Sequence, residues 1–408
     1  MYNNLDIAFL GGLFPKEKEA EILKNSIGSI QNAANNLQWE LVRGLDANLE
    51  KPVKIFNSLF IGSFPKRYKK MTIDTYNFSH FLGNSEDINV GFLNLPGIKN
   101  FSRYRSLKLY LKKWALSKTN KKKVIIAYAM TATFTHLLEY VKKVNGDVKT
   151  CLIVPDLPQY MNLSSGRNKI YNSLKNIEIK HINSNMKYID SYVLLTKYMG
   201  QKLNVSVPSV VVEGVSTNLF EGIKHIPPKE GIKTVLYSGG LNERYGIVNL
   251  VRAFEKLPEE NFRLIICGSG ESEEVIQKAS NRDKRIIFKG LLKREEVLQL
   301  QKSSTILVNP RANNEEYTKY SFPSKIMEYL SSGTPVIAYK LDGMPEEYND
   351  YIYPIKDGFD GLFITLKQVL SKEEQELYNK GQKAMEFVLT QKNSEKQTNK
   401  ILKMVNGL

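Results

Sequence analysis

The sequence has little cysteine and no long apolar run, and both absences narrow the class of protein. Its 408 residues include only Cys151 and Cys267, too few for a disulfide framework or a four-cysteine zinc site. No window approaches the roughly 20 apolar residues that cross a bilayer. The segment Met1–Pro15 also lacks the basic start and apolar core of a secretion signal. We therefore expect a cytoplasmic chain that touches a membrane, if at all, peripherally from one side.

Metal-binding patterns are missing as well. The four histidines are scattered without metal-ligand spacing, and no Asp-x-Asp motif is present. The glycine-rich turns lack the full spacing of a dinucleotide fingerprint, so redox chemistry with a nicotinamide or flavin is not supported. The sequence leads us to expect no metal and no cofactor.

The composition is otherwise that of an ordinary globular protein, with 42% hydrophobic residues, and the excess of basic residues is unevenly distributed along the chain. The formal net charge is +16, of which +13 falls on residues up to Gly222 and +3 on the remainder. The segment Lys99–Lys123 is rich in Lys and Arg and contains no acidic residue. Three interpretations stay open: a solvated helix whose Leu, Tyr and Trp face the core, a helix lying on an anionic lipid surface, and a nucleic-acid contact.

Short apolar runs alternate with helical-period segments along the whole chain, which is typical of parallel sheets covered by helices on both faces. We expect an α/β protein with two doubly wound domains, 1–222 and 223–371, joined near the Pro- and Gly-containing segment Phe220–Lys233. Residues 372–408 are expected to form a helical segment, interrupted at Gly381, that crosses back to the first domain. The expected strands are Ile7–Leu10, Val53–Ile61, Val124–Tyr128, Thr150–Val154, Tyr192–Leu195, Val210–Val212, Thr234–Tyr237, Arg263–Cys267, Arg285–Phe288, Ser304–Val308 and Val336–Tyr339.

Two turns in the second half follow apolar strands and carry glycine. In Val235–Gly246, Gly239 and Gly240 lead into a short loop with Arg244 and then a helix. In Leu264–Glu271, the strand is followed by Gly268-Ser269-Gly270. Glycine lets the backbone approach a ligand closely, and a helix start beside an Arg suits a phosphate. Either turn could equally be structural.

The segment Tyr317–Ala338 predicts a short helix that begins at Pro323, near a capping Ser321, and ends before Gly333. Lys325 and Glu328 lie three residues apart and therefore on one face. A carboxylate there accepts two hydroxyl hydrogen bonds from a ribose, and the free amides of the helix start face a diphosphate. The alternative is a Lys–Glu surface pair.

These elements in their order resemble the donor half of glycosyltransferase family 4. The resemblance rests on the two glycine turns, Phe288-x-Gly290, Val308-Asn-Pro310, Phe322-Pro-Ser-Lys-x-x-Glu-Tyr329 and Ser332-Gly-Thr-Pro-Val-Ile337, and covers Thr234–Pro354 strongly. It implies a GT-B architecture of two Rossmann-like domains facing a cleft, a nucleotide-diphosphate sugar as donor, retention of anomeric configuration and no metal-binding Asp-x-Asp motif. The first domain would bind the acceptor and the second the nucleotide sugar.

The resemblance implies a carboxylate pair at the donor sugar and ribose, but this sequence departs from it. Glu328 matches the second Glu of the family's Glu-x7-Glu element, the one expected to hold the ribose. The first Glu falls on Tyr320. Either the sugar-facing acid is absent, or Glu315 or Glu316 supplies it from the preceding loop.

The family's phosphate-binding Arg and Lys are also replaced, by Gly240 and Tyr245. Arg244 becomes the main phosphate candidate and Lys325 the second, both as catalytic residues that stabilise the leaving diphosphate. The expected donor-binding set is Gly11, Gly12, Gly239, Gly240, Gly268, Ser269, Tyr320, Ser321, Phe322, Pro323, Ser324 and Glu328.

Three features of the first half point to the acceptor. Ile7–Pro15 is similar to the family's first strand and glycine loop, with Gly11 and Gly12 under the donor phosphate and acceptor, although the pair could simply make a turn. Asp156 follows a strand and either orients and deprotonates an acceptor hydroxyl or forms a turn between prolines. His136 is a second acceptor-binding candidate, with a core or capping role as its alternative.

The predicted function is transfer of a sugar, with UDP-sugars favoured as donors, to a saccharide acceptor, for which we expect a lipid-linked saccharide, in surface polysaccharide or glycoconjugate synthesis. The rival interpretations are a sugar-nucleotide epimerase or phosphorylase on the same fold, a non-catalytic partner subunit of a transferase, and a basic nucleic-acid binder. We expect no nucleic-acid partner, because no known nucleic-acid module is present.

Overall fold

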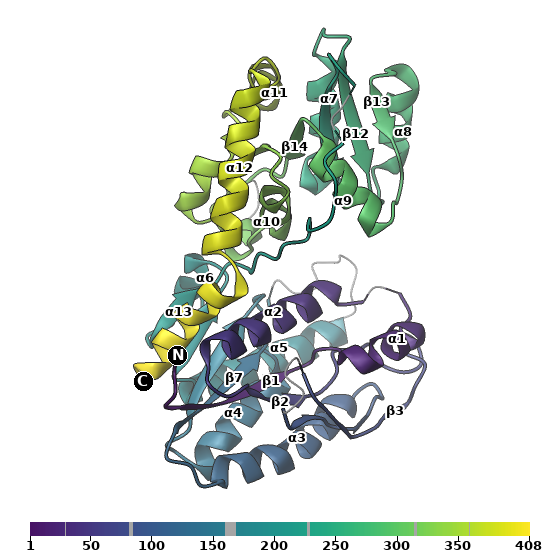
Figure 1. Ribbon diagram of the computed structural model, residues 1–408. Helices are drawn as coiled ribbons and strands as arrows, with labels where there is room; N and C mark the ends of the chain where they lie inside the picture. Colours follow the sequence, from purple (N-terminus) through teal and green to yellow (C-terminus); the bar gives the residue numbers. More distant parts are fainter. Residues whose placement is uncertain (29, 81–84, 160–168, 227–228, 314–315, 359) are drawn as a thin grey trace. The chain divides into compact units, whose positions relative to one another are not determined.

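The computed structural model covers the whole chain and describes all of it except residues 29, 81–84, 160–168, 227–228, 314–315 and 359. The chain forms two compact units, Met1–Val215 with Ser394–Leu408, and Ser216–Asn393. Each unit contains its own parallel sheet with helices on both faces (Figure 1).

The first unit is built on an eight-stranded sheet whose order is β10-β9-β8-β7-β1-β2-β5-β4. All neighbouring strands run parallel except β4, which is antiparallel to β5. The central strands are almost continuous apolar runs because both of their faces are buried. Their bounds are β1 Leu5–Gly11, β2 Lys54–Asn57, β4 Tyr76–Phe78, β5 Asp87–Asn89, β7 Lys122–Tyr128, β8 Lys149–Val154, β9 Ser191–Leu194 and β10 Ser209–Val211, with a separate antiparallel pair of β3 Thr72–Ile73 and β6 Phe92–Leu93.

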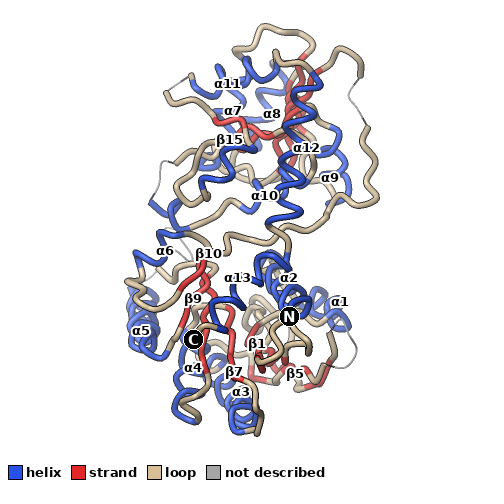
Figure 2. Tube along the Cα trace, turned by 60° about the vertical axis from the view of Figure 1, so that its left-hand side comes forward, coloured by secondary structure: helices blue, strands red, loops and turns tan. Residues whose placement is uncertain are grey.

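Helices cover both faces of this sheet, as Figure 2 shows in blue against the red strands. On one face α2 packs against α13, where Leu41 and Leu45 share a core with Ile401 and Leu402. On the other face α3 and α4 pack against each other and α5 continues the row. The bounds are α1 Lys16–Asn25, α2 Asn32–Asn48, α3 Lys99–Leu116, α4 Ala132–Val144, α5 Lys169–Asn185, α6 Lys197–Lys202 and α13 Ser394–Asn406.

The second unit has a six-stranded, wholly parallel sheet in the order β13-β12-β11-β14-β15-β16. The chain runs outward from β11 to β13 and then returns to place β14 on the other side of β11. The carboxyl ends of β11 and β14 therefore flank the topological switch point, the usual ligand site of such sheets. The strands are β11 Lys233–Ser238, β12 Phe262–Cys267, β13 Ile286–Phe288, β14 Ile306–Asn309, β15 Val336–Ala338 and β16 Tyr353–Pro354.

Two apolar cores hold the second unit's helices to its sheet. The core around Val235, Phe254 and Leu366 joins one face of the sheet to α7, α8 and α11. The core around Leu236, Leu330 and Val388 joins the opposite face to α10 and α12, with α9 packed beside them. The helices are α7 Ile247–Glu255, α8 Glu273–Arg282, α9 Arg294–Ser303, α10 Ser324–Ser331, α11 Gly361–Leu370 and α12 Glu374–Gln391.

The expected α/β architecture is confirmed, and each strand segment indicated by the sequence overlaps an observed strand. The segment expected as Val53–Ile61 is shorter, because the strand ends at Asn57, whose side chain donates to the Leu13 carbonyl. The short strands β3, β4, β5, β6 and β16 were not indicated. Among the described residues, no helix is long and apolar enough to cross a membrane.

The C-terminal segment is two helices that pack in different units. The break lies between α12 and α13 at Lys392–Asn393, and not at Gly381, which is inside α12. A Cβ at Gly381 would stand 2.0 Å from the Gly333 carbonyl, so glycine allows α12 to approach the end of α10 closely. Of the expected 372–408 segment, only Ser394–Leu408 lies in the first unit.

The chain leaves the first unit after Val215, earlier than the boundary expected at Gly222. Most of the expected linker packs in the second unit, where Lys302 donates to the Ile223 carbonyl at 2.6 Å and Gln299 to the Lys224 carbonyl at 2.8 Å. Pro227 and Pro228, on which the linker prediction partly rested, lie outside the described residues.

Candidate functional site

The ends of β11 and β12 form a tight backbone platform in the second unit. Gly239 and Gly268 have φ values of +153° and +136°, and a Cβ at Gly268 would stand 1.8 Å from the Gly239 carbonyl oxygen. The Gly239 amide donates a hydrogen bond to the Cys267 carbonyl and the Leu241 amide to the Ser269 carbonyl, each at 2.9 Å. Within the described ranges, the amides of Gly240 and Ser269 have no hydrogen-bond acceptor. Both residues are exposed, so both amides are available to an anion.

Lys325 joins α10 to this platform. Its ammonium donates to the Ser238 carbonyl and lies over Gly239, where a Cβ would stand 2.5 Å from Nζ. The ring of Tyr329 lies 5.7 Å from Nζ and supplies a cation–π contact. Burial lowers the pKa of Lys325, and the Glu328 carboxylate only partly opposes this. No carboxylate in the described part of the chain forms an ion pair with Lys325, so a cation is held at the strand end without a counter-ion.

Glu328 is one turn further along α10 and is held in place by α9. Its Oε1 accepts from Gln301 Nε2 at 2.7 Å, and the same Nε2 donates to Ser238 Oγ at 2.9 Å. Arg294 Nη2 is 3.5 Å from Glu328 Oε2. Lys325 and Glu328 therefore form no ion pair with each other. They lie on the same face of α10, as predicted, and each is held by different neighbours.

Arg244 occupies a one-turn 3-10 helix, Glu243–Tyr245, between the platform and α7. Its guanidinium is exposed and stacks 5.2 Å from the centroid of the Tyr245 ring, which in turn packs against Gly240. Gly246 closes the turn with φ +79°, and a Cβ there would stand 2.1 Å from the Pro310 carbonyl at the end of β14. The Arg244 loop and the Lys325 helix thus contact adjacent glycines, the loop at Gly240 through Tyr245 and the helix at Gly239 through Lys325.

The start of α10 differs in detail from the expected cap. The helix is Ser324–Ser331, with Pro323 at the N-cap position and no side-chain cap. The Ser321 hydroxyl accepts a hydrogen bond from Arg311 Nη2 at 3.2 Å instead. Phe322 is buried against the ring of Tyr348 at 5.3 Å and anchors this segment, while Ser324 is exposed.

Arg311 and Gln301 belong to this site but were not singled out from the sequence. Arg311 follows β14 and stacks 5.1 Å from the Tyr317 ring. Its buried Nε has no hydrogen-bond partner among the described residues. The Val308-Asn-Pro310 motif directly before Arg311 was the available indication, whereas nothing in the sequence distinguishes Gln301 from a surface glutamine.

Tyr320, which stands at the family's first Glu position, has a carboxylate beside it. The Tyr320 hydroxyl donates to Glu316 Oε1 at 3.2 Å, within the 3-10 helix Glu316–Tyr320. Glu316 is exposed, so its carboxylate can reach solvent or a ligand. Glu315, the other acid proposed for this role, lies outside the described residues.

In the first unit, β1 ends at Gly11 and Gly12 follows it directly, and both glycines are buried. The Gly12 amide donates to Gln38 Oε1 at 2.8 Å, and a Cβ at Gly12 would overlap the Phe60 ring at 2.0 Å. These glycines allow Phe60 and Gln38 to pack against the strand end. Close packing against Phe60 and Gln38 is therefore sufficient to account for glycine at both positions, and the role of the pair in donor binding stays a prediction.

Asp156 and His136 occupy different places in the first unit. Asp156 follows β8 and is accessible to solvent, although neighbouring protein atoms reduce its hydration and raise its pKa. His136 is half-buried on α4, with its ring 6.3 Å from Tyr104 of α3 and 5.8 Å from His181 of α5. The structure thus places His136 in the helical layer, in contact with aromatic rings from both neighbouring helices.

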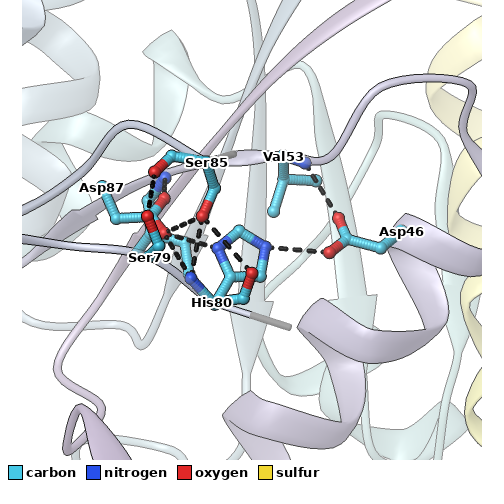
Figure 3. A network of polar contacts seen from close by, with 7 residues as sticks. Asp46, Val53, Ser79, His80, Ser85 and Asp87 are labelled. Carbon is cyan, nitrogen blue, oxygen red and sulfur yellow. Dashed lines mark hydrogen bonds and ion pairs between the residues drawn. The ribbon is translucent and has the colours of Figure 1, made fainter. Parts of the chain in front are cut away.

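A buried charged cluster lies elsewhere in the first unit, around His80 (Figure 3). Its Nδ1 is 2.5 Å from Asp87 Oδ2 and its Nε2 is 2.8 Å from Asp46 Oδ2. Burial disfavours the charged ring, but the two carboxylates outweigh it and raise the pKa of His80 to about 9. Val53 and Ile55 amides donate to Asp46 and Asp87 at 2.8 and 2.9 Å, which ties β2 to this cluster. Because Asp46 belongs to α2 and Asp87 to β5, the cluster joins α2, β2 and β5 and stabilises the fold of the first unit.

The described residues include no group of three or more His, Cys, Asp or Glu side chains that could hold a metal ion. The second unit instead offers cations, glycine amides and one anchored carboxylate at a single sheet edge. This combination suits a ligand with two phosphates and a hydroxyl-bearing sugar.

Comparison with known proteins agrees with this geometry. Residues 221–399 match the family model described as glycosyl transferases group 1. No curated protein sequence matches the chain. Among solved structures, sucrose-phosphate synthase from Thermosynechococcus elongatus has a TM-score of 0.61 at 15% identity, with 98% of each chain covered.

Two further structures are similar over nearly the whole chain. The lipopolysaccharide outer core galactosyltransferase WaaB has a TM-score of 0.61 at 15% identity, covering 98% of this chain and 99% of that one. The E. coli structure described as trehalose-6-phosphate bound with UDP-2-fluoro glucose has a TM-score of 0.63 at 8% identity, covering 99% of each. The chain therefore has the GT-B fold, and its second unit carries the sequence pattern of the group 1 glycosyl transferases.

Proposed function

We propose that the chain is a retaining glycosyltransferase that moves a sugar from a nucleotide-diphosphate sugar to the hydroxyl of a saccharide acceptor. UDP is the favoured nucleotide, and no metal is required. The observation that carries the proposal is the Lys325 ammonium, held over Gly239 at the carboxyl end of β11 with no ion-pair partner among the described residues. A half-buried cation without a paired charge carries a desolvation cost that a bound anion offsets.

In this proposal the second unit binds the donor. The diphosphate accepts hydrogen bonds from Lys325, Arg244 and the amides of Gly240 and Ser269, and Glu328 accepts from the ribose hydroxyls. Gln301 and Arg294 fix the Glu328 carboxylate for that task. The bond between the sugar's anomeric carbon and the diphosphate oxygen breaks, and the developing negative charge is stabilised by these preorganised donors.

The acceptor is assigned to the first unit. Its hydroxyl oxygen forms the new bond on the face from which the diphosphate leaves, and its proton passes to Asp156. The raised pKa of Asp156 makes this carboxylate a stronger proton acceptor than an ordinary aspartate. A lipid-linked saccharide at the inner face of the cell membrane is the acceptor class we favour, in surface polysaccharide or glycoconjugate synthesis.

Glu316 is our candidate for the sugar-facing acid. Its carboxylate accepts a hydrogen bond from the hydroxyl of Tyr320, the residue that falls on the first Glu position in the resemblance to glycosyltransferase family 4. If Glu316 does not serve the donor sugar, the non-catalytic partner subunit becomes the better account, because Tyr320 cannot replace a carboxylate. Glu316→Gln is the discriminating variant, and it should lower kcat while leaving UDP affinity unchanged.

The experiment that tests the function is turnover by the purified chain alone. A thermal-shift screen of nucleotide sugars selects the donor, and nucleotide release is then measured with and without saccharide acceptors. Acceptor-dependent release with a glycosylated product supports the transferase. Isomerised sugar nucleotide formed without acceptor would indicate an epimerase, and binding without turnover would indicate a partner subunit.

A further inference from the structure

One exposed face of α3 carries alternating apolar and basic side chains. We call it the α3 face and define it by Ile98, Phe101, Arg105, Leu109, Lys112 and Leu116, which recur at intervals of three and four residues and so form one stripe along the helix. All six are exposed, with Leu109 69% and Phe101 61% accessible. Exposure this high for large apolar side chains spaced along one helix marks an interaction surface.

These apolar side chains are not needed by the core of the unit. The opposite side of α3 buries Leu107, Leu111 and Trp114 against the sheet and α4. Three basic side chains of the segment Lys99–Lys123 are turned inward: Lys99 donates to the Ile61 carbonyl, Arg103 to Ser58 and Lys123 to the Trp114 carbonyl. The α3 face is therefore a separate surface with its own composition.

The charged side chains of the α3 face, Arg105 and Lys112, are both positive, and helix α3 contains no acidic residue. Lys113 and Lys118 are exposed beside this face, and Glu17 and Glu86 line the same surface pocket as Lys113. The carboxylate of Glu139 on the neighbouring helix α4 is paired with Lys143 at 2.7 Å. Figure 1 shows α3 and α4 side by side at the rim of the first unit.

We propose that the α3 face binds an anionic lipid surface. Lys and Arg meet the lipid headgroups while Leu and Phe between them enter the boundary with the acyl chains, the arrangement of interfacial helices. The apolar side chains favour lipid over nucleic acid, because Ile98, Leu109 and Leu116 gain by leaving water and offer no hydrogen bond or stacking plane to a base. This inference concerns a surface outside the donor site and does not depend on catalysis.

The test measures partition of the full-length chain onto vesicles by sedimentation. We expect binding to phosphatidylcholine vesicles that contain phosphatidylglycerol, little binding to phosphatidylcholine alone, and weakening by added salt. Each cation at the surface contributes roughly fivefold, so the double variant Arg105→Gln/Lys112→Gln should bind about 25-fold less. Leu109→Gln should lower binding about tenfold, since a leucine no longer enters the interface.

Matched controls come from α8 in the second unit, where Val275, Lys278 and Lys284 near its end are exposed. Val275→Gln removes one exposed aliphatic side chain and Lys278→Gln/Lys284→Gln removes two positive charges, as the test variants do, and both should bind as the unaltered chain does. Equal losses from both sets of variants, or no binding of the unaltered chain to anionic vesicles, would overturn the proposal. Binding to RNA with no binding to vesicles would also overturn it. Because the vesicle-binding assay does not require turnover, its outcome does not depend on the glycosyltransferase assignment.

Discussion

Replacing Lys325 by methionine should separate the stability of the second unit from its affinity for a diphosphate. Methionine keeps the unbranched stem but removes the ammonium that donates to the Ser238 carbonyl. That carbonyl retains a hydrogen bond from the Tyr329 hydroxyl at 3.2 Å, so it is not left unsatisfied.

The stability change follows from the desolvation of the cation. The lost hydrogen bond to a charged group costs about 1.5–3 kcal/mol. The half-buried ammonium also carries a desolvation cost, and methionine does not. The two nearly cancel, and we expect the free energy of unfolding of Lys325→Met to be unchanged or about 1 kcal/mol higher.

The affinity change should be large and in the opposite direction. A charge-assisted contact with phosphate contributes about 1.5–3 kcal/mol, which corresponds to roughly a 10- to 150-fold rise in the Kd of UDP. Calorimetric titration with UDP and thermal denaturation of the same samples measure both quantities. Lys284→Met, an exposed lysine of the same unit, is the control and should change neither.

The pH dependence provides a check on the same residue. Because burial lowers the pKa of Lys325 in the folded state, the unfolded chain binds more protons between that pKa and the ordinary value of 10.5. Stability from this group therefore rises with pH across that window, and Lys325→Met should remove the rise. A variant that unfolds several kcal/mol more easily and binds UDP normally would refute the reasoning, since Lys325 would then be structural.

Three further predictions concern the buried cluster, the glycine platform and the ribose contact. The folded-state pKa of His80, about 9, is above its ordinary 6.5, so its contribution is fully present below pH 6.5 and is lost as pH rises through 9. His80→Gln should destabilise the first unit by about 3–5 kcal/mol at neutral pH and flatten its pH profile in denaturant titrations, whereas His181→Gln should not. Gly268→Ala should prevent stable folding of the second unit, measured by circular dichroism, because its Cβ would meet the Gly239 carbonyl. Gly290→Ala, where φ is +64° and the space is open, should cost only about 1–3 kcal/mol. Glu328→Gln should raise the Kd of UDP about tenfold and leave that of pyrophosphate unchanged in calorimetric titrations, because a neutral amide is a weaker acceptor for ribose hydroxyls.

Contrary results would be equally specific. A His80→Gln chain with an unchanged pH profile would mean that the ring is neutral in the folded state. Equal effects of the two glycine substitutions would show that backbone strain, and not the close approach of two strand ends, limits the platform. A parallel loss of UDP and pyrophosphate binding in Glu328→Gln would place this carboxylate near the phosphates.

Strands with strong apolar runs could be predicted from the sequence because burial on both faces leaves a contiguous pattern. The edge strand β4 and its neighbour β5 could not, because Tyr76-Asn-Phe78 and Asp87-Ile-Asn89 are short and partly polar. The break at Lys392–Asn393 contains neither glycine nor proline, while Gly381 serves close packing inside a helix. Local propensity therefore misplaced the end of α12.

The site was predictable where the backbone itself constrains the residue type. Gly239 and Gly268 are required by positive φ and close approach, and the spacing of Lys325 and Glu328 fixes their helix face. Arg311 could not be identified, because its role depends on Ser321 and Tyr317, which are brought to it by the fold. Fold-dependent contacts of this kind leave no periodic mark in the sequence.

The most direct test of the central claim is a crystal structure of the full chain with UDP. We predict that the diphosphate lies within about 3 Å of Lys325 Nζ, the Arg244 guanidinium and the Gly240 amide, with the ribose on Glu328. Density for the diphosphate away from the carboxyl ends of β11 and β12, or bound with Lys325 still directed at Ser238 and Arg244 in solvent, would contradict the account.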